Sequence, residues 1–294
     1  MNVRFRLPTL VYKTVSEGRV GWGTGGIAAV IIVVGMLGAV SEAWAQKRTS
    51  AAVTSPSTRH ADFEAVLHRF VDSTGAVDYA GLTVHADSVL DPYLQHLAAA
   101  QPSTLDREAR LAFWINAYNA YTLKLIVEHY PVRNIWGITP GPAEPKENSP
   151  FALKVGPVAD TVRTLDEIEH DIIRRRFDEP RIHFALVCAA SSCPTLRRVP
   201  YTGVRLDAQL DDQARTFLHD RAKNQIPAGE DRIALSRILK WYGSDFGPTT
   251  DALQRAVAPY FDGPVRRRLA DADYAVTYLP YDWTLNDQAL PAPE

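Results

Sequence analysis

Residues 107–130 carry apolar side chains on nearly every face of the helix that their spacing predicts. Such a helix cannot lie on the surface of a folded domain, because its apolar side chains would stay in contact with water. Pro131 cannot continue the helix and therefore marks its end. The sequence thus predicts one buried central helix around which the remaining elements pack.

Most other segments show helical periodicity, with short apolar runs between them. Thr164 and Glu167 have the spacing of a capping box, so a helix is expected from there to about Phe177. The run 181–188 is predicted to be a buried strand. The expected fold class is α+β: a helix-rich single globular domain with a small mixed sheet around a buried central helix. Further helices are expected near 63–70, 90–97, 206–223, 237–242 and 250–269, with a strand or turn at 76–79 and strands at 232–235 and 274–279.

The N-terminus has the three parts of an export signal. Basic residues come first, an apolar run follows over 27–40, and Ala43-Trp44-Ala45 has the small-x-small pattern of a cleavage site. Cleavage after Ala45 would remove 1–45 as a signal peptide. The alternative is an uncleaved membrane anchor, because residues 20–41 carry no charge and about 20 apolar residues span a bilayer. In both cases the domain is expected outside the cytoplasm, periplasmic or secreted.

Two further segments have compositions that disfavour regular structure. Residues 46–58 are rich in Ser, Thr and Ala and are predicted to be a flexible tether before a single domain at 59–294. Residues 139–150 contain four prolines, one glycine and three charged residues. An exposed loop is expected there, and long loops of this kind sometimes cover a site.

The charge balance argues against nucleic acid as a partner. The net charge is -2, and no run of Lys and Arg forms a basic stripe. The expected partner is instead an unknown small-molecule, peptide or envelope substrate. Contact with a membrane is expected only through the N-terminal segment, if that segment is retained.

Five stretches of the chain have distinctive motifs: Phe-Trp-Ile-Asn-Ala-Tyr-Asn-Ala at 113–120, Leu-Asp-Glu-Ile-Glu-His at 165–170, the stretch 183–194, Trp-Tyr with Asp-Phe within 241–246, and 281–286. These motifs resemble those of the family called domain of unknown function 547. The resemblance covers roughly residues 63–286 and implies the fold of that family, but it supplies no substrate. The chain has Val187-Cys188-Ala189 where the family often has Asn-Cys-Gly.

Cys188 and Cys193 are the only cysteines in the chain. In an oxidising compartment two such cysteines favour a disulfide. Closing this short loop would stabilise the fold by about 2 kcal/mol. The competing hypothesis makes Cys193 a nucleophile in the turn before Pro194. A redox-active pair and an inert core position also remain open.

Glu169 lies in the middle of an apolar helix face that Ile168 and Ile172 help to form. A buried carboxylate must be paired, be protonated or face a polar cleft, because an unpaired buried charge costs several kcal/mol. Arg176 lies on the same predicted face and supplies the structural alternative of a buried ion pair.

A set of polar residues could carry thiol chemistry. Cys193 would be the nucleophile, His183 or His170 the base and Glu169 the orienting carboxylate, as in thiol hydrolases and acyl transferases. Asn116 and Asn119 share one face of the central helix and could donate to an oxyanion. The alternative for each residue is structural: hydrogen-bonded core histidines, and amides that fix a loop to the helix.

The sequence also contains residues that could form a metal site or an aromatic pocket. Glu169, His170 and His183 could supply three metal ligands, but their spacing matches no zinc signature, so no metal and no cofactor is expected. Aromatic residues within the central helix are expected in the core, whereas aromatic residues at element ends could line a pocket. The core group is Trp114, Tyr118 and Tyr121, and the pocket group is Trp241, Tyr242 and Trp283.

Two functions follow from the sequence. The first is a thiol-dependent hydrolase or acyl or amide transferase that acts outside the cytoplasm. The second is a non-catalytic binding or scaffold domain with a structural Cys188-Cys193 disulfide.

Overall fold

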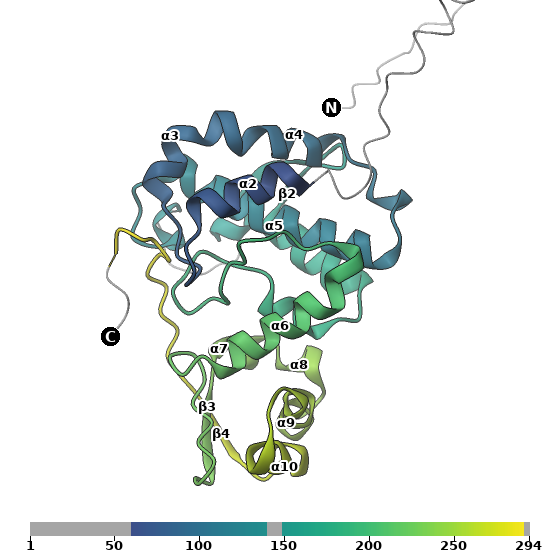
Figure 1. The fold of residues 1–294 in the computed structure, drawn as a ribbon, viewed down its shortest axis with the longest axis vertical. Coiled ribbons are helices and arrows are strands. Elements are labelled where there is room, and N and C mark those ends of the chain that lie inside the picture. The colour runs from purple at the N-terminus through teal and green to yellow at the C-terminus, as the bar shows by residue number, and fades with distance from the viewer. Residues whose placement is uncertain (1–59, 140–148, 291–294) are drawn as a thin grey trace, which may run out of the picture. The chain divides into compact units, whose positions relative to one another are not determined.

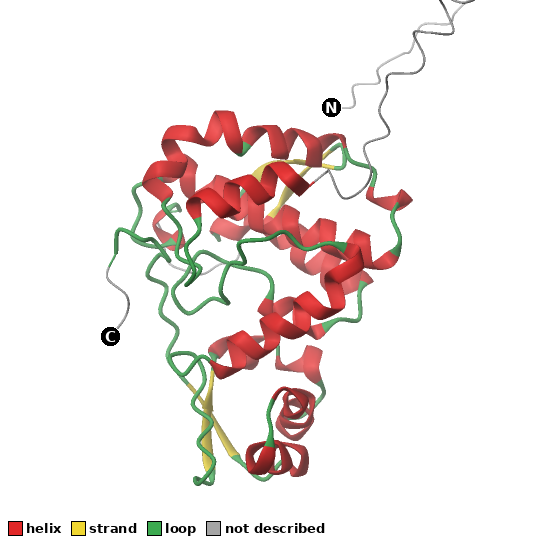
Figure 2. Ribbon diagram, in the orientation of Figure 1, coloured by secondary structure: helices red, strands yellow, loops and turns green. Residues whose placement is uncertain are grey.

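The computed structural model describes residues 60–139 and 149–290. The predicted leader, the predicted tether and most of the loop at 139–150 lie outside the described residues, so those predictions stay predictions. Among the helices described, none is both long and apolar enough to cross a bilayer. The described chain is rich in helix with short strands, which confirms the helix-rich α+β class (Figures 1 and 2).

Helix α5 (Arg107–His129) is the central element (Figure 1). The Asp106 side chain caps its first turn by accepting a hydrogen bond from the Ala109 amide at 2.7 Å. Nearly every side chain between Leu111 and Val127 is buried. Several other elements pack against α5, and its side chains are buried between them, so the prediction of a buried central helix is confirmed.

Three helices precede α5 in the chain. They are α2 (Ala61–Phe70), α3 (Tyr79–Val89) and α4 (Asp91–Ala99), and they pack against one another and, for α3 and α4, against α5. The sequence predicted α2 and α4 but not α3. The buried stripe of α3 consists only of Tyr79, Leu82 and Ala86, which is too short for a clear period.

The strands form two separate pairs in place of one mixed sheet. Strands β1 (Lys154–Val158) and β2 (Thr161–Thr164) are antiparallel, whereas β3 (Arg232–Leu235) and β4 (Ala275–Tyr278) are parallel and were predicted. The β1–β2 turn consists of Ala159 and Asp160, both with positive φ. Their amides donate to the carbonyls of Leu97 and Ala98, so the turn also satisfies the end of α4. Neither residue gives the usual Asn-Gly turn signal, which explains why this hairpin was not predicted.

The capping box is confirmed in geometry. The Thr164 amide donates to the Glu167 carboxylate at 2.8 Å, and the Glu167 amide donates to the Thr164 hydroxyl at 2.9 Å. The helix that follows is a π-helix, η7 (Glu167–Arg174), instead of an α-helix. Its wider turn still buries one face, on which Ile168 and Glu169 lie. Wide turns of this kind occur often at functional sites.

The predicted strand at 181–188 is wrong. The chain forms a short 3-10 helix, η8 (Pro180–Phe184), and then an irregular buried segment. Pro180 stands at the first helical position, and the Glu179 side chain accepts the hydrogen bond of the Arg181 amide. The backbone beyond η8 is paired by side-chain amides of Asn119 and Gln213 instead of by a neighbouring strand.

A second apolar cluster forms between later elements. These are α6 (Leu206–His219), α7 (Arg237–Trp241), α9 (Thr250–Val257), α10 (Gly263–Asp271) and the β3–β4 pair. One helix was expected over 250–269, but Pro259 lies in a 3-10 turn after α9, and Gly263 begins α10 with φ +57°. Tyr281 packs against both the first cluster around α5 and this second cluster.

Candidate functional site

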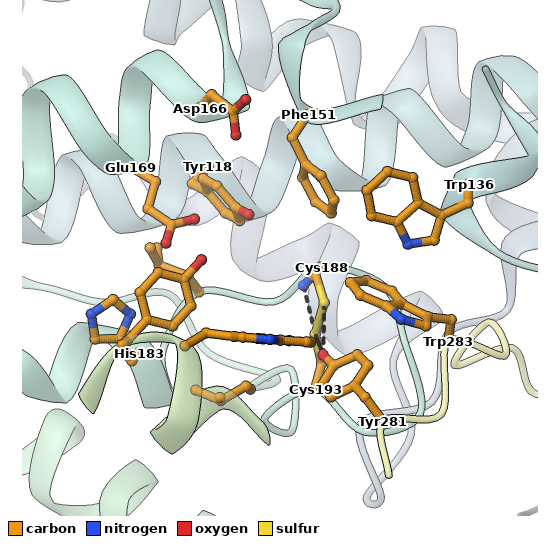
Figure 3. Close-up of a pocket in the computed structure, with 14 residues that line it drawn as sticks. Tyr118, Trp136, Phe151, Asp166, Glu169, His183, Cys188, Cys193, Tyr281 and Trp283 are labelled. Atoms are coloured by element: carbon orange, nitrogen blue, oxygen red, sulfur yellow. Dashed lines mark hydrogen bonds between the residues drawn. A yellow bond between two sulfur atoms is a disulfide. The ribbon is translucent and has the colours of Figure 1, made fainter. Parts of the chain in front are cut away.

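A cavity of about 260 Å³ opens between elements of the two apolar clusters. Seven of its fourteen lining residues are aromatic, and the others include Asp166, Glu169, His183 and both cysteines (Figure 3). The aromatic residues come from α5, from the loops on both sides of residues 140–148, from the end of α7 and from the C-terminal segment. They are Tyr118, Trp136, Phe151, Trp241, Tyr242, Tyr281 and Trp283.

Trp283 is at the centre of the aromatic wall. Trp136 meets it edge-on with ring centroids 5.3 Å apart, and Tyr281 lies 4.5 Å from it. Trp241 stacks on Trp283 at 5.9 Å and is 45% exposed, so it borders the opening. These side chains hold one another in place and present ring surface to the cavity.

Glu169 supplies a buried carboxylate at the other end of the pocket, beside Tyr118 and Asp166 (Figure 3). Its side chain is 9% exposed, and the Tyr242 hydroxyl is hydrogen-bonded to it. Burial and the Glu169 charge raise the pKa of Tyr242 well above its usual value, so the phenol stays protonated and donates. The expected Arg176 ion pair is absent from the described chain, since Arg176 is exposed.

His183 is held from behind by Asp245. Its Nε2 lies 2.8 Å from the Asp245 carboxylate, and its ring stacks on Tyr242 at 4.0 Å. Arg174 donates to both oxygens of Asp245 at 2.7 Å. The hydrogen bonds from His183 and Arg174 hold the pKa of Asp245 well below its usual range, so this carboxylate is charged at neutral pH.

Cys188 and Cys193 form a disulfide with Cα atoms 6.2 Å apart, as predicted. The Cys188 amide donates to the Cys193 sulfur at 2.9 Å. The Tyr281 hydroxyl contacts both sulfurs, at 3.1 and 3.2 Å (Figure 3). Cys193 is 3% exposed and Cys188 is half-buried, so Cys188 is the more accessible of the two residues. In this state Cys193 carries no thiolate.

The predicted catalytic residues do not all meet. Glu169, His183 and Cys193 line the cavity, but His170 is exposed, and its Nδ1 accepts a hydrogen bond from Arg174 at 3.2 Å. The hydrogen-bond partner of His183 is Asp245, and Figure 3 draws His183 and the disulfide apart within the pocket.

Asn116 and Asn119 lie outside the cavity and fix loops to α5. Asn116 bonds the Tyr201 amide and carbonyl at 2.9 and 2.8 Å. Asn119 donates to the Ala185 carbonyl at 3.0 Å and accepts from the Val187 amide at 2.9 Å. Both amides are thus used by backbone groups, which is the structural alternative stated for them.

The metal alternative has no support in the geometry. Within the part of the chain that is described, no three His, Cys, Asp or Glu side chains are arranged to hold a metal ion. His170 is exposed and is not among the residues that line the cavity, whereas the Nε2 of His183 is hydrogen-bonded to Asp245.

Part of the aromatic wall was predicted from the sequence. Trp241, Tyr242 and Trp283 line the cavity as expected, and Tyr118, expected in the core, is buried with its ring at the cavity. Trp114 and Tyr121 are buried away from it. Arg174, Asp245 and Tyr281 were not assigned any role. Asp245 and Tyr281 could have been predicted as site residues, because they fall within the motifs at 241–246 and 281–286.

The comparisons with known proteins found a similarity to one family over part of the chain. Neither the curated proteins nor the solved structures contain a match to the chain. One family model, described as protein of unknown function, DUF547, matches residues 102–218. That segment contains α5, η7, η8 and the disulfide, whereas Trp241 and Trp283 come from outside it. Over residues 102–218 the chain is therefore similar to the DUF547 family of proteins of unknown function.

Proposed function

We propose that this protein is a small-molecule binding domain whose aromatic pocket takes an apolar or aromatic part of its ligand. The observation that carries the proposal is the set of seven aromatic side chains around one small cavity. Ligand sites are typically concave, mostly apolar and equipped with a few polar groups, and this pocket has that composition. The Cys188–Cys193 disulfide supports the proposal by fixing one wall.

Binding can be tested with a set of small aromatic compounds of differing charge, detected by ligand-observed NMR. Wild-type protein should bind members of the set. Trp241→Ala should bind them roughly two- to tenfold more weakly, because one aromatic contact contributes about 0.5–1.5 kcal/mol. Trp241 is half-exposed, so its truncation leaves the core intact. Tyr278→Ala, an aromatic residue outside the pocket, is the control and should bind normally. If no compound binds the folded wild type, the proposal is wrong.

Thiol chemistry is a second candidate because both cysteines line the same cavity. As a hydrolase or acyl or amide transferase, the protein would first need its disulfide reduced, since only a thiolate attacks. Graded alkylation of the reduced protein tests this. A nucleophilic Cys193 should react faster than Cys188 despite its deeper burial, whereas faster reaction of Cys188 would follow exposure alone and oppose the thiol mechanism.

We further propose that the domain works outside the cytoplasm, periplasmic or secreted. The proposal is supported by the basic and apolar pattern of residues 1–45 and by a disulfide, which persists mainly in oxidising compartments. The mass of the protein recovered from expressing cells tests it. A mature chain beginning at Gln46 is expected, and an intact cytoplasmic chain with two free thiols would contradict export.

A further inference from the structure

The Cys188–Cys193 disulfide lies at the wall of the aromatic cavity, where a small molecule can reach it (Figure 3). The cavity measures about 260 Å³, and an apolar cavity of about 150 Å³ already holds one benzene ring. Cys188 is half-buried whereas Cys193 is 3% exposed, so Cys188 is the residue that a molecule in the cavity meets first. A disulfide that only closes a loop needs no such access.

Two hydrogen-bond donors meet the Cys193 sulfur. The Cys188 amide donates to it at 2.9 Å, and the Tyr281 hydroxyl oxygen lies 3.2 Å from it. Because the sulfurs of a disulfide carry no hydrogen, the hydroxyl is the donor in this contact. Burial raises the pKa of Tyr281 well above its usual value, so the phenol keeps its proton. Of the two donors, the hydroxyl alone is also hydrogen-bonded to the Cys188 sulfur in the described structure, at 3.1 Å.

We propose that this disulfide is redox-active and exchanges with a small thiol that has an apolar or aromatic body. In such an exchange a thiolate attacks one sulfur and the other sulfur leaves as a thiolate. Access favours attack at Cys188, and the two donors stabilise the negative charge that forms on Cys193. Both observations thus favour the same direction of exchange. The preference for an apolar body rests on the proposed binding function.

The exchange is balanced over two steps. The first thiolate bonds to the Cys188 sulfur while the disulfide bond breaks, and the electron pair of that bond stays on Cys193 as a thiolate. The proton of the entering thiol has already gone to water, because only the thiolate attacks. A second thiolate then attacks the sulfur of the bound thiol, which forms a small-molecule disulfide and releases Cys188 as a thiolate. Two thiols are oxidised and the protein disulfide is reduced.

Two thiols of similar acidity test the preference for an apolar body. Phenylmethanethiol carries one aromatic ring, and 2-mercaptoethanol carries none. Each is mixed with the oxidised full chain, the reaction is quenched with acid, and mass spectrometry follows the loss of the protein disulfide. The ring thiol should react about tenfold faster or more, because the cavity holds its ring beside the disulfide. An oxidised peptide of residues 188–193 has no cavity and should react with both thiols at similar rates. Equal rates with the protein would overturn the inference.

The position of the mixed disulfide tests the direction of exchange. Peptide mapping of the acid-quenched protein should find the ring thiol attached mainly to Cys188. Attachment mainly to Cys193, or equally to both cysteines, would show that access and the two donors do not set the direction, and would overturn the assignment.

The hydroxyl of Tyr281 can be removed without its ring. Tyr281→Phe keeps the ring against Trp241 and Trp283 and should slow the exchange about tenfold, the scale of one hydrogen bond to a charged group. Tyr278→Phe removes a hydroxyl from a residue that does not line the cavity, and it should react at the wild-type rate. Equal rates in the two variants would overturn the stabilisation of the leaving thiolate by Tyr281.

Phenylmethanol separates this inference from the proposed function. It has the ring but no sulfur, so it should bind the pocket in ligand-observed NMR and slow the reaction of the ring thiol. If the alcohol binds while the protein shows no preference for the ring thiol, the pocket binds ligands but the exchange inference is wrong. If the alcohol does not bind and no preference is seen, the exchange inference is again wrong, and the broader aromatic set decides whether the pocket binds ligands at all.

Discussion

Asp245 is the residue that joins the charged groups behind the pocket. Its carboxylate accepts hydrogen bonds from the His183 ring and from two nitrogens of the Arg174 guanidinium, Nε and Nη2. We expect Asp245→Asn to lower the free energy of unfolding by about 2–3 kcal/mol, because hydrogen bonds to a charged group contribute more than neutral ones. Urea denaturation at neutral pH measures the change. The variant should also loosen Tyr242, which stacks on His183.

The lowered pKa of Asp245 also predicts a pH dependence. A carboxyl group with a depressed folded-state pKa stabilises the fold above its unfolded pKa, and this contribution is lost as the pH falls through the folded value. The wild-type free energy of unfolding should therefore fall between about pH 5 and pH 2 more steeply than that of Asp245→Asn. Asp231→Asn removes an exposed partner of Arg268 and should retain the wild-type slope. Parallel curves for wild type and Asp245→Asn would contradict the assignment.

Asn119 and Asn116 make similar hydrogen bonds, but alanine substitutions at the two positions should differ in their effect on the disulfide. Each makes two buried hydrogen bonds to backbone groups, so alanine at either position should destabilise the fold by about 2–3 kcal/mol in urea. Only Asn119 fixes the segment that leads to Cys188. Asn119→Ala should therefore speed reduction of the disulfide by dithiothreitol, whereas Asn116→Ala should not. Equal reduction rates would show that Asn119 does not hold this segment in place.

At the residue scale, the sequence predicts those site residues that are unusual in their local surroundings. Glu169 lies among apolar neighbours on one helix, and the two cysteines stand alone in the chain, so each needs an explanation without any knowledge of the fold. Asp245 has no such local signal. Its partner His183 is 62 positions away, and only the tertiary structure brings the two together.

The loop closed by the disulfide is the element that fixes one pocket wall. Replacing both cysteines by alanine should lower the free energy of unfolding by about 2 kcal/mol, the value expected for closing a loop this short. The variant should also release the Tyr281 hydroxyl from the two sulfurs. Urea denaturation with and without reductant provides the measurement. Reductant should destabilise the wild type and leave the double variant unchanged, and an effect on both would point to another cause.

At the scale of elements, prediction succeeds where the signal is local. The central helix needs only a run of apolar residues and a terminating proline, and the capping box needs only Thr164 and Glu167. The run 181–188 was misjudged because burial alone does not distinguish a strand from irregular chain. Its backbone partners are side chains of Asn119 and Gln213, which belong to distant helices.

At the scale of the whole molecule, the last described segment connects distant parts of the chain. The Asn286 carbonyl accepts from the Val77 amide, and the Asn286 side chain accepts from the Tyr79 hydroxyl across 207 positions. The Asp287 carboxylate accepts from Tyr130 at 2.9 Å. The segment matched by the family model contains none of these C-terminal residues, so the pocket and its supports need the larger domain.

A truncation after Pro280 tests this dependence. It removes Tyr281 and Trp283 from the pocket and the buried side chain of Leu285 from the core. Burial of one leucine alone contributes about 2 kcal/mol, and the lost hydrogen bonds of Asn286 and Asp287 add to this. We therefore expect a lower midpoint in urea and no binding of aromatic compounds. A second truncation, after Leu290, keeps every one of these contacts and should match the full chain in both measurements. If the shorter chain retains full stability, the C-terminal segment is not part of the cooperative fold.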